Sequence, residues 1–152
     1  RQKVVDEIML RFLFLIGIVG FFASCGKSTK YDQENEPDSL LNVRAAVVSQ
    51  RLPHEEGSLT MVKCEYDGKT VNISLKVKEG CDELMDREML KWLPAMKLND
   101  IHTLDTLMIK RLVELNQPLT YSVYSSKDSL INKFSLSAAK LKGRAGSYGM
   151  LK

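Results

Sequence analysis

Cysteine and histidine, the side chains that most often do chemistry in proteins, are few in this 152-residue sequence. The cysteines are Cys25, Cys64 and Cys81, and the histidines are His54 and His102. A metal site needs several such ligands close together, yet no Cys-x-x-Cys or His-x-x-x-His pair occurs. A nucleophile needs a base beside it, and the Gly-x-Ser-x-Gly pattern is missing too. The sequence therefore predicts no metal centre, no cofactor and no catalytic site.

Cys25 stands at the end of a segment that has the three parts of an export signal. Arg11 supplies a basic start, residues 12–22 are apolar, and the small residues Ala23 and Ser24 precede the cysteine. The apolar run is about half of the roughly 20 residues that a transmembrane helix needs. We therefore expect a cleaved signal peptide here rather than a membrane span.

The sequence Phe22-Ala23-Ser24-Cys25-Gly26 resembles the lipobox of bacterial lipoproteins, with Phe22 in place of the more usual leucine. The resemblance implies cleavage before Cys25 and acylation of that cysteine, and several acyl chains form a stable membrane anchor. It also implies a lipid-anchored location in the cell envelope, at the outer membrane. An ordinary signal peptide with a chance cysteine and a buried N-terminal helix remain the alternatives.

Composition divides the chain into four segments. Residues 1–24 are an N-terminal extension with the signal peptide, and the polar residues 25–38 form a lipidated flexible tether. An α+β domain follows over residues 39–142, a length typical of one domain. The glycine-containing residues 143–152 are expected to be a flexible tail.

The first half of the domain reads as a helix followed by a hairpin. Apolar residues from Leu41 to Leu52 recur on one helix face, and Pro53 must end that helix. Two alternating segments, 62–66 and 71–77, flank Asp67-Gly68, a strong signal for a two-residue turn. The turn sets a register in which the side chains at positions 64 and 71, and those at 62 and 73, lie opposite each other.

The second half repeats this order with longer helices. An apolar stripe from Met85 to Leu93 predicts a helix that ends near Pro94, and a second stripe over residues 101–115 predicts another that ends before Pro118. Strands are expected over residues 119–124 and 130–136, with Leu119 and Tyr121 facing Leu136 and Phe134.

These elements predict an α+β fold: a four-stranded antiparallel sheet made of two hairpins, with helices packed on one face. The two helix-hairpin segments are alike enough to indicate a duplicated αββ unit, while two independent hairpins remain the alternative. The layout also resembles small envelope lipoproteins of gut bacteria that have a helix, a hairpin, a helical middle and a second hairpin. That resemblance rests on pattern and transfers no functional residue.

Two further features bear on binding and stability. The predicted helix faces carry four methionines and a tryptophan: Met85, Met89, Trp92, Met96 and Met108. These side chains would form an adaptable apolar groove for a peptide or lipid. The alternative is that they simply fill the core. In the predicted register Cys81 lies about ten residues, or roughly 33 Å, from Cys64 along the strand. We therefore expect two free thiols, unless the chain after Val77 folds back sharply.

The formal net charge of +3 is small, and this near balance of charges gives no basic footprint for nucleic acid. The expected function is that of a non-catalytic binding or interaction module that contacts the membrane through its lipid and recognises an envelope protein or peptide. A structural or assembly accessory of an envelope complex is the alternative, and an enzyme is the least favoured class.

Overall fold

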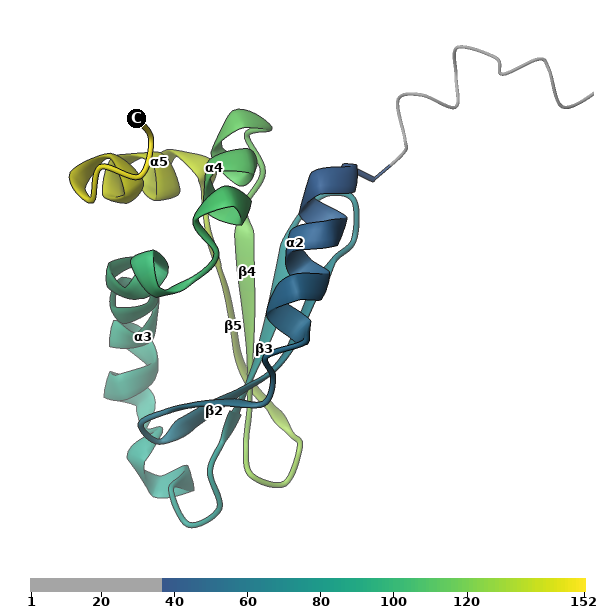
Figure 1. Ribbon diagram of the computed structural model, residues 1–152. Helices are drawn as coiled ribbons and strands as arrows, with labels where there is room; N and C mark the ends of the chain where they lie inside the picture. Colours follow the sequence, from purple (N-terminus) through teal and green to yellow (C-terminus); the bar gives the residue numbers. More distant parts are fainter. Residues whose placement is uncertain (1–36) are drawn as a thin grey trace, which may run out of the picture. The chain divides into compact units, whose positions relative to one another are not determined.

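A mixed five-stranded sheet supports residues 37–152, the part of the chain that the computed structural model describes. The strands follow one another across the sheet in chain order (Figure 1): β1 (His54–Glu56), β2 (Leu59–Tyr66), β3 (Val71–Val77), β4 (Leu119–Tyr124) and β5 (Leu130–Leu136). Neighbours are antiparallel except β3 and β4, which are parallel. The prediction of a four-stranded antiparallel sheet is therefore wrong in both strand number and strand direction.

The parallel pair follows from the length of the segment between the two hairpins. Parallel neighbours need a crossover of about a dozen residues or more. The segment that joins β3 to β4 holds two α-helices and two short 3-10 helices: η1 (Asp82–Leu84), α3 (Arg87–Asn99), η2 (Asp100–Thr103) and α4 (Thr106–Glu114). It returns the chain to the end of the sheet at which β3 began, so β4 runs beside β3 in the same direction.

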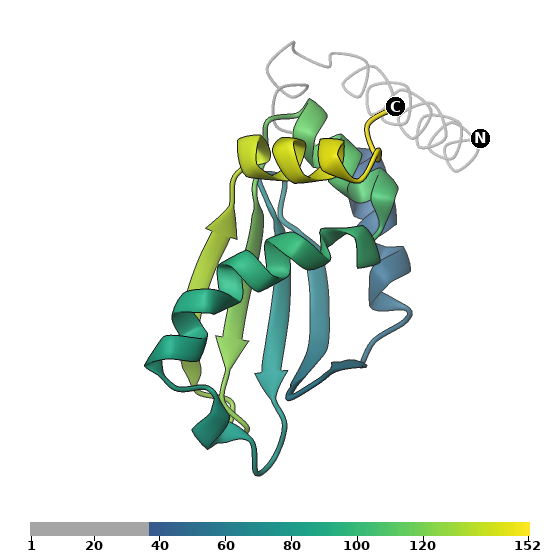
Figure 2. The same ribbon diagram turned by 90° about the vertical axis from the view of Figure 1, so that its left-hand side faces the viewer.

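The helices share one hydrophobic core with the sheet. In β3, fully buried residues alternate with partly exposed ones, so one face of the sheet is apolar. The buried side chains of α2 (Ser39–Ser49), α3, α4 and α5 (Ala138–Ser147) join those of the strands in a single cluster. Figure 2 shows α3 crossing this face of the sheet, with α5 at one end of it. Residues 37–152 thus form a compact unit with its own core.

The register of the first hairpin differs from the prediction by two residues. Tyr66 pairs with Val71, and Cys64 pairs with Ile73, because the turn has four residues instead of two. The carboxylate of Asp67 holds this turn, since its Oδ1 accepts hydrogen bonds from the backbone N–H groups at positions 69 and 70, both at 2.9 Å. A shift of two residues leaves each side chain on the same face of the sheet.

A β-bulge in β2 changes which side chains are buried. The pairing with β3 is irregular between Met61 and Lys63, so the alternation of faces is interrupted there. As a result Leu59 and Met61 are buried, whereas Val62, which was expected on the apolar face, is 41% exposed. The second hairpin has the predicted register.

The confirmed pairs of the second hairpin are Leu119 with Leu136 and Tyr121 with Phe134. The last two rings are stacked with their centres 5.1 Å apart. At the far edge of the sheet, β5 contributes the buried Leu136 and the half-buried Phe134 to the apolar face.

Two of the predicted helices have boundaries that differ from expectation. Helix α3 continues through Pro94 to Asn99, and the carbonyl of Leu90, which lost its helical partner to that proline, accepts a long bond of 3.5 Å from Asn132 Nδ2. The predicted helix over residues 101–115 is divided, because Asp105 caps a separate helix α4.

The first half of the flexible tail predicted over residues 143–152 is the end of α5 instead. Ala145 of this helix is fully buried, and the side chains of Met150 and Leu151 pack against the core. Burial of these small and apolar groups offsets the low helix propensity of the glycines.

The predicted signal peptide, the lipidation of Cys25 and the tether up to residue 36 lie outside the described residues. Asp38, at the end of that tether, belongs to the domain, where its Oδ1 accepts a bond of 3.0 Å from the backbone N–H of Leu41 and caps α2. Within residues 37–152, no helix has the length and apolar character needed to cross a membrane.

Candidate functional site

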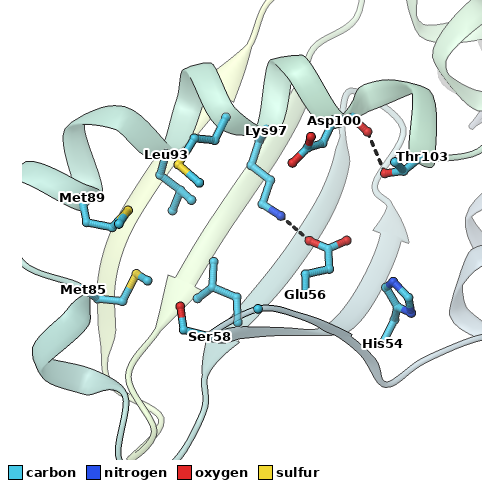
Figure 3. Close-up of a pocket in the computed structure, with 12 residues that line it drawn as sticks. His54, Glu56, Ser58, Met85, Met89, Leu93, Lys97, Asp100 and Thr103 are labelled. Carbon is cyan, nitrogen blue, oxygen red and sulfur yellow. Dashed lines mark hydrogen bonds and ion pairs between the residues drawn. The ribbon is translucent and has the colours of Figure 1, made fainter.

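A pocket of about 440 Å³ lies between α3 and the β1–β2 hairpin (Figure 3). One wall consists of Met85 and of side chains from α3 and η2, and the other consists of β1, the turn after it and the start of β2. The lining residues are His54, Glu56, Gly57, Ser58, Leu59, Met85, Met89, Leu93, Met96, Lys97, Asp100 and Thr103. The volume is within the range of pockets that hold small ligands or single side chains.

The apolar wall of the pocket follows from the spacing of apolar residues along the helical segment. Met85, Met89, Leu93 and Met96 recur at intervals of three or four residues, so they lie along one side of the helical segment. Asp86 starts α3 in this orientation, because its Oδ1 accepts a bond of 2.8 Å from the backbone N–H of Met89. Exposure rises from Leu93, at 1%, to Met96 at the rim, at 45%. Flexible methionines at a rim can adapt to the shape of a bound group.

A buried ion pair crosses the pocket. Lys97 on α3 is only 7% exposed, and its Nζ donates a hydrogen bond to Oε2 of Glu56 on β1. Figure 3 shows the two side chains meeting between the helix and the hairpin. A buried ammonium needs such a partner, because an isolated charge is costly to remove from water. The pair therefore connects the three-residue edge strand β1 to α3.

The polar end of the pocket is formed by η2 and the start of β1. Asp100 and Thr103 come from η2, where the Oγ1 of Thr103 donates a bond of 2.7 Å to the backbone carbonyl of Asp100. His54 lies across from them on β1 (Figure 3). With Glu56, Lys97 and Asp100 together, this end has one negative charge more than it has positive charges. An apolar wall beside a weakly acidic end is an arrangement for binding, and it contains no nucleophile held by a base.

Three of the five residues predicted to form an apolar groove line this pocket. Met85, Met89 and Met96 are among its walls. Trp92 is on α3 as well, but it is 65% exposed and is not among the lining residues. Met108 is fully buried in the core on α4, which is the alternative that the sequence left open.

Glu56 and Lys97 were not expected at a site. A lysine four residues after the core-facing Leu93 was the available signal, because that position faces the core and requires an acidic partner. The partner itself could not be found, since β1 was not predicted as a strand.

The isolated thiols and imidazoles stay apart in the structure. Cys64 is buried and Cys81 half-buried, and both are free. Burial, together with smaller contributions from the charges of Glu65 and Asp105, raises the pKa of the Cys64 thiol to about 11. A neutral buried thiol is a poor nucleophile. Within residues 37–152, no group of His, Cys, Asp and Glu side chains is placed to hold a metal ion.

Comparison with known proteins shows a likeness in fold. No protein-family model matches the sequence. No curated protein matches it either. The solved pilotin EpsS of the Vibrio vulnificus type 2 secretion system has a similar fold, with a TM-score of 0.54 and 19% identity, over 66% of this chain and 87% of that one.

Two further solved structures agree with this result. The type II secretion pilotin AspS from Vibrio cholerae has a TM-score of 0.52 and 15% identity, over 66% of this chain and 88% of its own. A protein of Pseudomonas aeruginosa described as secreted has a TM-score of 0.53 and 18% identity, over 76% of this chain and 99% of its own. At these identities the likeness establishes the fold alone.

Proposed function

We propose that this protein is a non-catalytic, lipid-anchored accessory of a protein assembly in the cell envelope. The observation that carries the proposal is the fold, which the domain shares with two pilotins of type 2 secretion systems. The lipobox-like sequence at Cys25 supports it independently, because it comes from a segment outside the compared domain. The assembly role was the alternative in the sequence analysis, and the fold now makes it the favoured one.

We further propose that the pocket between α3 and the β1–β2 hairpin is where the partner protein is bound. An apolar side chain of the partner would enter between Met89 and Met96, while its polar groups would meet Asp100 and His54 at the other end. Exposed methionines are favourable in this role because they adapt to an incoming group and release water from apolar surface.

The experiment combines site-specific crosslinking with purification of the lipidated protein from its own membrane. A photoreactive residue in place of Met89, which lines the pocket, should capture one defined envelope protein, and the same residue at position 43 on α2 should not. Met96→Lys should abolish the capture, because a charge at the rim cannot be desolvated without a partner.

Val43→Lys is the matched control, since Val43 is apolar and 56% exposed but is not part of the pocket. Both variants replace exposed side chains, so both should keep the stability of the wild-type domain. Equal capture by the two lysine variants would show that the pocket is not the contact site. Capture of no defined envelope protein at either position would contradict the assembly role.

A small-ligand binding module is the second candidate. The volume of the pocket favours it, since about 440 Å³ is enough for a small apolar molecule. Native mass spectrometry of protein purified from its source distinguishes the two. A bound small molecule that Met96→Lys removes would favour the ligand, whereas protein that is free of ligand would favour the partner segment.

A further inference from the structure

The positive charge of the described domain is concentrated at the C-terminal helix. Residues 138–152 contain four basic side chains and no acidic one: Lys140, Lys142, Arg144 and Lys152. Residues 37–137 contain 13 basic and 14 acidic side chains, so the rest of the domain carries almost no net charge. Helix α5 therefore has a surface whose charge differs from that of its surroundings.

These basic groups are available to a partner. Lys140, Lys142 and Lys152 are exposed, and the guanidinium carbon of Arg144 lies 4.7 Å from the centre of the Tyr148 ring. Among residues 37–152, none of the four basic side chains takes part in an ion pair, whereas Lys76 and Lys78 on the sheet both do. Uncompensated charges of one sign create a field that attracts an anionic surface.

Helix α5 lies at the end of the domain where the chain enters. The Oδ2 of Asp38 accepts a bond of 2.7 Å from Nη2 of Arg111 on α4, and α4 packs against α5. Figure 1 shows the start of α2, α4 and α5 at one end of the sheet. The chain before Pro37 therefore leaves the domain close to this basic surface.

We propose that α5 and the residues after it bind anionic phospholipid headgroups of the membrane in which the protein is anchored. The proposal rests on the proposed lipid anchor at Cys25, because the anchor places this end of the domain near the bilayer. A tether of the 11 residues between Cys25 and Pro37 spans roughly 20 Å if flexible. Charges attract a membrane only within about one Debye length, about 8 Å at physiological salt. A short tether would therefore help, because it keeps the basic surface near the bilayer.

This docking would also orient the candidate pocket. The pocket is bordered by β1, which pairs with the start of β2, while Pro37 lies beside the turn that follows the end of β2. The β1 edge of the pocket therefore lies the length of β2 away from the point where the chain enters the domain, whereas the η2 end of the pocket packs against α5. Headgroup binding at α5 would hold the β1 edge of the pocket away from the bilayer, where a partner protein can reach it.

The test measures binding of the domain, residues 37–152, to vesicles by co-sedimentation. The domain should bind phosphatidylcholine vesicles that contain about one third phosphatidylglycerol, and it should not bind vesicles of phosphatidylcholine alone. Raising the salt to about 0.5 M should release it. The double variant Lys140→Glu/Lys142→Glu should lower the partition coefficient by about tenfold or more, because each basic group near an anionic surface strengthens binding several-fold.

Lys127→Glu/Lys133→Glu is the matched control, since it changes net charge by the same amount at exposed sites outside α5. It should lower binding by no more than about twofold. Equal losses in the two double variants, or no binding of the wild-type domain to anionic vesicles, would overturn the proposal. Binding to polyglutamate without binding to vesicles would overturn it as well, in favour of an acidic protein partner. Because this domain lacks Cys25, the result is independent of whether the anchor and the assembly role are correct.

Discussion

Lys97 and Glu56 show how a single pair of residues shapes the candidate site. The side chain of Lys97 on α3 is buried, and Glu56 on the edge strand is its acidic partner. Replacing such a pair with apolar residues often costs little, whereas removing one partner is costly because the other charge stays buried. The pair therefore specifies where β1 lies more than it adds to stability.

Glu56→Gln should consequently destabilise the domain by about 2 kcal/mol, somewhat less than for a fully buried pair because Glu56 is partly exposed. The double variant Glu56→Gln/Lys97→Met should recover most of that loss, since no unpaired charge remains. Glu55→Gln is the control, because Glu55 is exposed and pairs with Lys78 on the surface. Urea unfolding measures all three, and a larger loss in the double variant than in Glu56→Gln would contradict this role.

Asp105 combines a helix cap with an ion pair. Its Oδ1 accepts a bond of 2.9 Å from the backbone N–H of Met108, and its carboxylate accepts two bonds from the guanidinium of Arg44 on α2. The bond to Arg44 is the main reason that the pKa of this carboxyl is lowered, although burial opposes it. A lowered pKa in the folded state gives stability that is complete above the ordinary pKa of 3.8 and is lost as the pH falls through the folded value.

Asp105→Asn keeps a capping oxygen but removes the charge that pairs with Arg44. We expect it to cost about 1 to 2 kcal/mol at neutral pH. The difference from wild type should shrink below about pH 4, as the wild-type carboxylate becomes protonated. Asp86→Asn, at the cap of α3 where no ion pair is present within residues 37–152, is the control and should have a smaller effect at neutral pH. Unfolding curves recorded across acid pH would refute the assignment if the difference stayed constant.

At the scale of elements, the bulge in β2 decides which side chains reach the core. Before the bulge, odd-numbered residues of this strand point inward, and after it the even-numbered ones do. Val62 at the bulge is therefore exposed even though it is β-branched and apolar. The neighbouring strand β3 has no irregularity and keeps one buried face along its length.

Ile73→Ala and Val62→Ala test this arrangement. Ile73 is fully buried in the middle of β3, so its truncation should cost about 2 to 5 kcal/mol. Val62→Ala should change stability by less than about 0.5 kcal/mol, as is usual for surface positions. Equal losses in urea unfolding would mean that Val62 is buried, and the bulge would then be misplaced.

For the whole molecule, the proposed anchor and the described domain have separate tasks. The proposed anchor would determine which surface the protein works at, and the domain would determine what it binds there. In α5, the basic side chains face out from a helix whose other side is buried, so membrane contact does not compete with the core. The pocket on β1 and α3 is likewise independent of the anchor.

Cys25→Ser should abolish lipid attachment, because only a thiol accepts the acyl group, and the protein should leave the membrane fraction. Fractionation and labelling with palmitate measure this. The Cys81→Ser variant is the control and should remain lipidated, since Cys81 belongs to the domain. Continued palmitate incorporation in the Cys25→Ser protein would show that the lipobox assignment is wrong.

The sequence by itself determined the parts of this protein that depend on near neighbours. The inward face of α2, the ends of helices before Pro53 and Pro118, and the pairing of Tyr121 with Phe134 all follow from side-chain periodicity and turn residues a few positions apart. Such signals are local, so they can be read along the chain.

Only the tertiary structure decided the features that depend on residues far apart. The parallel pairing of β3 with β4 depends on where a crossover of about forty residues returns the chain. The helical state of residues 143–147 depends on burial of Ala145 against other elements, which outweighs its glycine-rich composition. The pocket requires a three-residue edge strand to meet a lysine 41 positions further along. Contacts of this kind produce no periodic pattern in a single sequence, because the two partners come into contact only after the chain has folded.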